Sequence, residues 1–165
     1  MSINTYRATS NLTCTLASLA TSSDWTVGRC SAGYSNATNK DDILAVAGQI
    51  MTGTSPTANP GTIEVWAFAQ RADSTWPDLF TASYSGSDGG FTVRSRNILF
   101  AGARLVAAMT TSTTSNLPYS FGPLDLAQLF GYVPKEVALF VTHNTGVALN
   151  GTGGNHVLTV HPAFY

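Results

Sequence analysis

The sequence predicts an all-β protein, a two-sheet antiparallel β-sandwich with a jelly-roll-like arrangement of strands and one short helix near residues 123–130. Two observations support this fold class. Short stretches of strand-forming residues are separated, roughly every ten residues, by turns rich in Gly, Pro and Asn. Two stretches, Thr62–Gln70 and Val137–Val141, are apolar on both faces, which is typical of strands in the middle of a sheet.

The first third of the chain begins with polar residues 1–10, which we expect to form an N-terminal arm or a short edge segment. Alternating apolar side chains predict a strand over Asn11–Leu19, and Trp25–Ala32 is predicted to extend again. A hairpin turning near Ser22 would place Cys14 opposite Cys30. That placement permits a disulfide without requiring one, and two reduced thiols fit a protein folded in a cytoplasm.

The composition of the next segment, Gly33–Asp42, predicts a loop. Its Asp41 and Asp42 lack the repeated acidic spacing and the distal Glu of a calcium-binding loop, so a solvated turn is expected. Ile43–Met51 is predicted as a strand, because Thr and Gly bound it and only the Asp pair offers a helix cap.

A long irregular segment follows over Arg71–Gly90, and loops of this length are either functional or covered by a neighbour. Its Trp76 and Tyr84 are the candidate contacts for a glycan or a partner, because an exposed aromatic face can stack on a sugar ring. Both residues could instead fold back on the domain or seal a contact between subunits.

Phe91–Leu99 is predicted as a strand that carries Arg94 and Arg96 on one face, where both are expected to be solvated or paired with Asp or Glu rather than to form an anion site. Another strand is expected over Ala103–Thr110. The short helix near residues 123–130 is predicted from Pro123 inside its start and Gly131 past its end, and it is expected to be the only regular helix.

The end of the chain is predicted to be a meander of extended segments and turns. Val147–Leu149 is expected to extend after the strand Val137–Val141, and His156–Val160 is expected to close the meander. Turns of Asn and Gly residues separate these segments.

Composition fits one domain over residues 1–165 and disfavours two classes of partner. Charged residues make up only 10% of the chain and the net charge is -1, whereas nucleic-acid affinity depends on Lys and Arg that neutralise phosphates. No basic amphipathic stretch suits a membrane surface. The first residues lack the pattern of a secretory signal, so we expect synthesis in a cytoplasm.

Residue chemistry offers no catalytic signature, so we expect no enzyme. His156 and His161 are five residues apart and would face opposite sides of a strand, which argues against a metal site shared with His143. No Gly-x-Ser-x-Gly elbow is present. Glu64 and Glu136, both on predicted strands, are one example of the carboxylate pair that a glycosidase needs, but any two carboxylates on strands would pass that test. No cofactor is implied.

Three segments carry a family resemblance: TIEVWAFAQ (residues 62–70), LDLAQLFGYVP (124–134) and KEVALFVTHNTGVALNGTGGNHVLTVHPAFY (135–165). They resemble small jelly-roll decoration, or cement, proteins of tailed bacteriophages. The resemblance implies a structural virion protein, made in the host cytoplasm, that binds the capsid surface and bridges major capsid protein subunits. It implies a homo-oligomer, with a trimer favoured, and assigns no site residue.

The apolar strands agree with that resemblance, because strands apolar on both faces need a second cover that a subunit or a shell surface would supply. The alternative function is a carbohydrate-binding β-sandwich module or fibre tip that uses Trp76 and Tyr84. An enzyme of the hydrolase type would instead depend on paired acidic residues or a histidine site.

Overall fold

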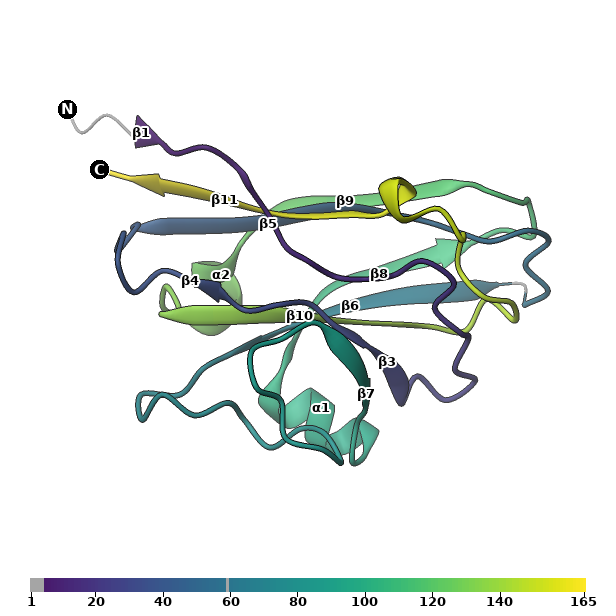
Figure 1. The fold of residues 1–165 in the computed structure, drawn as a ribbon, viewed down its shortest axis with the longest axis horizontal. Coiled ribbons are helices and arrows are strands. Elements are labelled where there is room, and N and C mark those ends of the chain that lie inside the picture. The colour runs from purple at the N-terminus through teal and green to yellow at the C-terminus, as the bar shows by residue number, and fades with distance from the viewer. Residues whose placement is uncertain (1–4, 59) are drawn as a thin grey trace.

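The computed structural model describes residues 5–58 and 60–165, which form two antiparallel sheets packed face to face (Figure 1). The strands of sheet A are β1 (Thr5–Tyr6), β2 (Ser10–Asn11), β5 (Ile43–Met51), β9 (Pro118–Asp125) and β11 (Val157–Phe164). Those of sheet B are β3 (Val27–Cys30), β4 (Tyr34–Ser35), β6 (Gly61–Ala69), β7 (Gly89–Thr92), β8 (Arg104–Thr111) and β10 (Glu136–His143).

The strand order is that of a jelly roll. Sheet A runs β1-β11-β5-β9 with β2 also on β11, and sheet B runs β7-β3-β10-β6-β8 with β4 also on β10. For comparison with a jelly roll, β1 with β2 and β3 with β4 can each be counted as one strand, and β7 can be set aside. Numbered along the chain, the eight remaining strands then lie side by side as 1-8-3-6 in sheet A and as 2-7-4-5 in sheet B. This interleaving of two sheets is the jelly-roll pattern. The predicted fold class is therefore confirmed.

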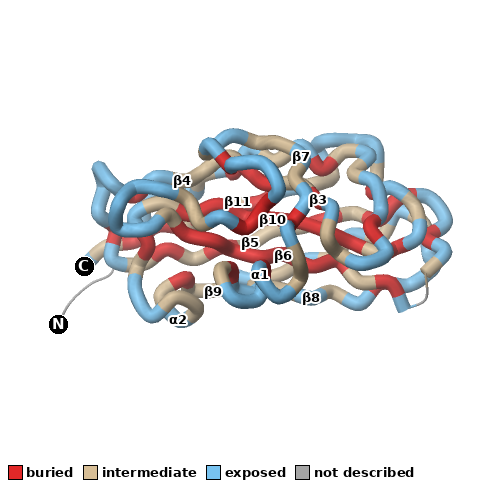
Figure 2. The backbone as a smooth tube through the Cα atoms, turned by 90° about the horizontal axis from the view of Figure 1, so that it is seen from below, coloured by how far each residue is buried: buried red, intermediate tan, exposed pale blue. Residues whose placement is uncertain are grey.

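The main core lies between the two sheets. Strand β10 runs through the middle of sheet B, and every residue from Val137 to His143 is buried (Figure 2). Burial of one large apolar side chain stabilises the fold by about 1.5–3 kcal/mol. The inter-sheet core consists of Leu12, Leu16, Leu44, Val46, Ile50, Ile63, Val65, Ala67, Leu126, Val137, Leu139, Val141, Leu149, Leu158 and Val160.

The outer face of sheet B is covered by the connection from β6 to β8, residues 70–103, which we call the cover segment. It contains β7 and helix α1 (Arg96–Gly102) and packs on the strands beneath it (Figure 1). The outer cluster between them consists of Cys30, Trp66, Phe68, Leu79, Phe80, Tyr84, Val93, Leu99, Ala103, Ala138 and Phe140. The chain therefore hides both apolar faces of β6 and β10 by itself, and the expectation that a partner must cover them is wrong.

An ion pair anchors the cover segment to sheet B. Asp88 accepts hydrogen bonds from Arg29 of β3, with Nε at 2.6 Å and Nη2 at 3.0 Å, and from the hydroxyl of Thr15 at 2.6 Å. Because the Arg29 and Asp88 side chains are only 27% and 13% exposed, solvent screens this pair less than an open surface pair.

Helix α1 occupies much of the predicted strand Phe91–Leu99, of which only the first two residues belong to β7. The hydroxyl of Ser95 accepts a hydrogen bond from the backbone N–H of Ile98 at 3.3 Å, which caps the helix start. Leu99 is its buried anchor. The expectation of one regular helix is therefore wrong, because packing on sheet B stabilises a second short helix.

The predicted helix near residues 123–130 is present as α2 (Leu126–Phe130), but it begins later than expected. Pro123 belongs to β9, and the side chain of Asp125 accepts the hydrogen bond from the N–H of Ala127 at 2.9 Å. Gly131 follows in the left-handed conformation, with φ of 78°, as its placement after the helix suggests.

Residues 11–19 do not form the predicted strand beyond Asn11. Their burial does alternate, with Leu12 and Leu16 buried, yet the segment crosses from one sheet to the other. The N–H of Leu12 donates to β11, and the carbonyl of Thr13 accepts from Ala32 beyond β3. The expected hairpin of residues 11–32 is therefore wrong, and the thiols of Cys14 and Cys30 are free.

Two smaller expectations are also corrected. Asp41 is buried rather than solvated and pairs with Arg7, which follows β1. Val147–Leu149 is not a strand, although Leu149 is buried. The closing turn contains the 3-10 helix η1 (Gly153–Asn155). Of residues 1–10, expected as an arm or a short edge segment, Thr5–Tyr6 form strand β1 and Ser10 begins β2, while residues 1–4 lie outside the described part.

Candidate functional site

Trp76 and Tyr84, the two residues selected from the sequence, line the same cleft. The cleft lies in the cover segment, has a volume of about 480 Å³ and is lined by residues 75–80, 82–84 and Arg94. The short bridge between Phe80 and Val93 holds its two sides together. We call it the cover cleft.

The aromatic wall of the cover cleft is part of the outer cluster. Tyr84 is buried, and its hydroxyl donates to the carbonyl of Ser31 at 2.6 Å, so burial raises the pKa of Tyr84. Trp76 is half-buried and meets the Tyr84 ring edge-to-face, with centroids 4.9 Å apart. Trp76 therefore offers accessible aromatic surface, whereas Tyr84 mainly supports it.

The rim of the cover cleft carries an exposed ion pair. Asp78 Oδ1 accepts from Arg94 at 3.2 Å (Nε) and 3.0 Å (Nη2). The Arg94 and Asp78 side chains are 46% and 71% exposed. Asp78 Oδ2 has no hydrogen bond to any part of the chain that the structure describes. The rim thus offers a free acceptor beside guanidinium donors.

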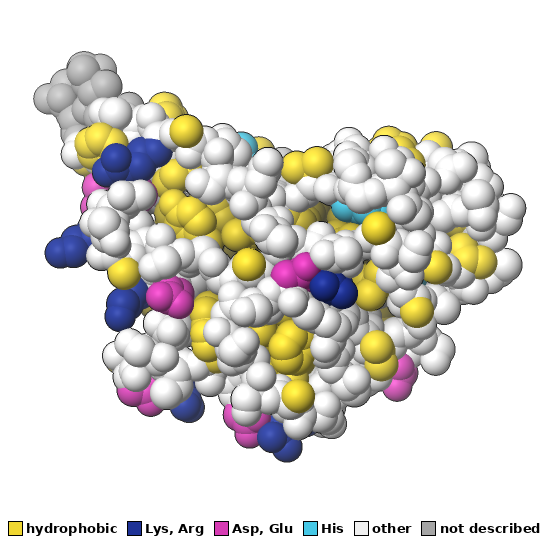
Figure 3. Space-filling view, in the orientation of Figure 1, with side chains coloured by type: hydrophobic (Ala, Val, Ile, Leu, Met, Phe, Trp, Pro, Cys, Tyr) yellow, Lys and Arg dark blue, Asp and Glu magenta, His cyan; other side chains and the backbone are white. Residues whose placement is uncertain are grey.

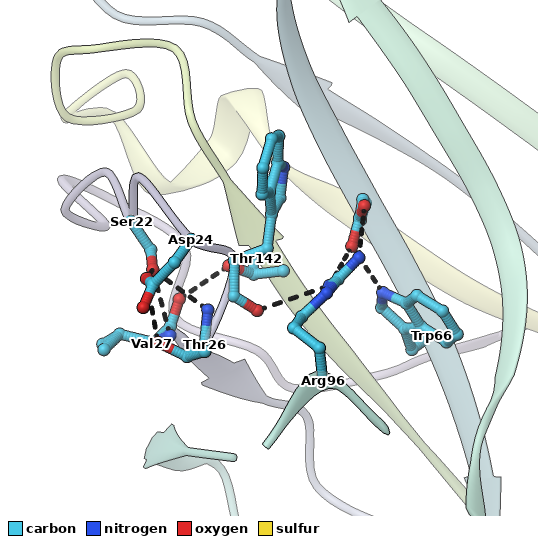
Figure 4. Close-up of polar contacts among 9 residues, drawn as sticks. Ser22, Asp24, Thr26, Val27, Trp66, Arg96 and Thr142 are labelled. Carbon is cyan, nitrogen blue, oxygen red and sulfur yellow. Dashed lines mark hydrogen bonds and ion pairs between the residues drawn. The ribbon is translucent and has the colours of Figure 1, made fainter. Parts of the chain in front are cut away.

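A second polar cluster lies where α1 meets sheet B (Figure 4). Glu64 of β6 accepts two hydrogen bonds from Arg96 of α1, at 2.6 and 2.9 Å, and one from the indole of Trp66 at 2.9 Å. The guanidinium lies 5.0 to 5.7 Å from the ring centroids of Trp25, Trp66 and Phe100. The expected pairing of Arg94 and Arg96 with acidic residues is confirmed. Because the chain's own Arg96 fills the aromatic cage, we assign it a structural role.

The two glutamates named from the sequence lie far apart. Glu64 pairs with Thr142, which lies six residues along β10 from Glu136. The two glutamates are therefore separated by about 20 Å at the usual rise per strand residue, too far for a glycosidase pair. Among residues 5–58 and 60–165, no group of three or more His, Cys, Asp or Glu could hold a metal.

His143 is a core residue at the end of β10. Its Nε2 donates to the carbonyl of Leu19 at 3.0 Å, and its Nδ1 lies 3.1 Å from the hydroxyl of Thr145. Burial away from water lowers the pKa of His143, and the backbone carbonyls of Leu19 and Ala20 offset this only in part. His143 therefore links two segments of the fold.

We expect the stability of the protein to fall as the pH drops below about 6.5, the pKa of an unfolded histidine. Below that pH the unfolded chain binds a proton that folded His143 resists, so the free energy of unfolding falls by at most about 1.4 kcal/mol per pH unit. Urea unfolding from about pH 7.5 to about pH 5 measures the slope, and His143→Gln should reduce it. An unchanged slope in that variant would remove His143 as its source.

Exposed apolar residues gather at one edge of sheet B. Phe100 of α1 is 56% exposed and stands edge-to-face on Trp66, with centroids 5.0 Å apart. Leu105 of β8 is 41% exposed and pairs with Trp66 across the strands. We call Phe100, Leu105 and strand β8 the edge patch. The face drawn in Figure 3 carries scattered charges among uncharged and apolar atoms.

No protein-family model, curated protein or solved structure matches the chain. The described part contains no helix that is long and apolar enough to cross a membrane.

Proposed function

We propose that this chain is a non-enzymatic structural protein that binds the outside of a phage capsid as an oligomer and stabilises the shell by bridging major capsid subunits. The observation that carries the proposal is the edge patch, where an open strand edge adjoins exposed apolar side chains. The jelly-roll fold occurs in viral capsid proteins, which adds support by analogy only. A protein that binds only the assembled shell stabilises it by mass action.

Strand β8 is the least protected edge of the sandwich. At the other edges, β1 has two residues, β7 has four, and β9 carries Pro118 and Pro123. Strand β8 has eight residues, no proline and a single charge, Arg104. It pairs only with β6 among the described strands, which leaves backbone groups free on its other side. Such an edge can accept a strand from another chain.

We assign the edge patch to a neighbouring copy of this chain. Val106 and Met109 of β8 pack on the inter-sheet core yet remain partly exposed, as expected where no strand lies beyond. With a net charge of -1, copies of the chain repel each other little. In the trimer that the resemblance implies, the contact is heterologous, so the patch meets a different surface of the next copy.

Leu105→Glu is expected to convert the oligomer to monomers, because a carboxylate would have to be desolvated in the contact. Light scattering after gel filtration measures the mass. Val157→Glu is the matched control, since Val157 is also a strand residue with 41% exposure but lies on β11 in the other sheet. Dissociation by both variants, or by neither, would exclude the edge patch as the interface.

Attachment to a shell is measured by cosedimentation with purified capsids that lack decoration. The expected result is saturable binding and a higher temperature of capsid disruption. A wild-type protein that is strictly monomeric and does not sediment with such shells would overturn the proposed function.

A further inference from the structure

We infer that the cover cleft is a binding site for a neutral saccharide, a function that is separate from attachment to a shell. A sugar ring presents an apolar face of C–H groups and an edge of hydroxyls that both donate and accept hydrogen bonds. A site for it needs a fixed aromatic surface and a small number of polar groups of both kinds. The cover cleft has both, within a volume of about 480 Å³.

The aromatic surface is held in place before any ligand binds. The Trp76 ring makes edge-to-face contacts with Phe68 at 5.5 Å and Tyr84 at 4.9 Å between centroids, and both of those residues are buried. Next to the indole, the N–H of Gly33 donates to the carbonyl of Gly86 at 2.9 Å. A Cβ at Gly33 would lie 3.2 Å from the Trp76 ring, so the backbone there packs closely on the indole. A fixed ring reduces the entropy cost of stacking.

The polar rim selects the class of ligand. Asp78 and Arg94 lie 3.0 Å apart and cancel each other's charge, so the cleft does not favour an anion or a cation. The free Asp78 Oδ2 accepts a hydrogen bond while the Arg94 guanidinium donates one. Two adjacent sugar hydroxyls match that pair. Ser83 is an exposed residue in the same lining, and its hydroxyl can both donate and accept a hydrogen bond.

Titration calorimetry with methyl glycosides of glucose, galactose, mannose and N-acetylglucosamine tests the site. We expect at least one to bind with a dissociation constant of about 1 mM, typical of a single small ring on an open site. Asp78→Asn should weaken that binding about tenfold by removing a charged acceptor. Trp76→Ala should abolish it.

Three controls make the outcome decisive. Tyr132→Ala removes an aromatic side chain that is 52% exposed outside the cover cleft and should bind as wild type does. Asp78 is itself 71% exposed, so its variant tests the site even if Trp76→Ala fails to fold. Leu105→Glu should still bind the glycoside, which separates this inference from the proposed oligomer. If none of the four glycosides binds, or if Asp78→Asn leaves the binding unchanged, the saccharide site is overturned.

Discussion

Phe68→Ala is expected to lower the free energy of unfolding by about 3–5 kcal/mol, the usual cost of truncating a fully buried phenylalanine. Phe68 belongs to β6, has no exposed surface, and its side chain packs in the outer cluster beneath the cover segment. Its ring meets Trp76, Phe80 and Tyr84 edge-to-face, with centroids 5.0 to 5.5 Å apart. Urea unfolding measures the change, and limited proteolysis should show earlier cleavage within residues 71–90.

Tyr132→Ala is the control for this substitution, because Tyr132 is 52% exposed and its removal should change stability by less than about 0.5 kcal/mol. If Phe68→Ala costs no more than the control, the cover segment does not hide the outer face of sheet B. The apolar strand β6 would then need another cover after all.

Glu64→Leu is expected to destabilise the protein by about 2–3 kcal/mol. The change leaves Arg96 without its carboxylate and the indole N–H of Trp66 without its acceptor. The loss stays below the cost for a completely buried pair because 25% of the Arg96 side chain is exposed. Chemical unfolding at neutral pH measures it.

The double variant Glu64→Leu with Arg96→Met gives the matched comparison. Removing both charges leaves no unpaired ion, so the double variant is expected to be more stable than Glu64→Leu alone. A double variant at least as unstable as the sum of the two single variants would show that the ion pair is not coupled, and that α1 docks through Leu99 alone.

Strands β5, β6 and β10 could be predicted within one or two residues because continuous apolar runs are bounded by Gly, Thr or Pro. Helix α1 could not, because its seven residues show no clear period and its start depends on Ser95, while Arg96 reaches Glu64 far along the chain. The strand predicted over residues 11–19 is wrong for another reason. Their alternating burial is real, but Leu12 bonds to Leu158 of β11 and Thr13 bonds to Ala32 beyond β3, rather than both bonding to one neighbouring strand.

The cover segment explains why apolar strand faces did not predict a partner. Pattern alone shows that both faces of β6 avoid water, but not whether the same chain or another supplies the cover. The residues of the cover cleft could likewise be predicted only in part. Trp76 and Tyr84 could be selected as aromatics in a long loop, whereas the pairing of Asp78 with Arg94 depends on the bridge between Phe80 and Val93.

Amide hydrogen exchange of β8, compared between concentrated and dilute protein, tests most directly whether the open edge of sheet B is where copies of this chain meet. We expect the amides of Arg104–Thr111 to be protected in the concentrated sample, and the amides that point away from β6 to exchange faster on dilution or in Leu105→Glu. The amides of β10 should stay protected in every sample, because that strand is buried within one copy. Protection of β8 that does not change with concentration or with the substitution would contradict the assembly role.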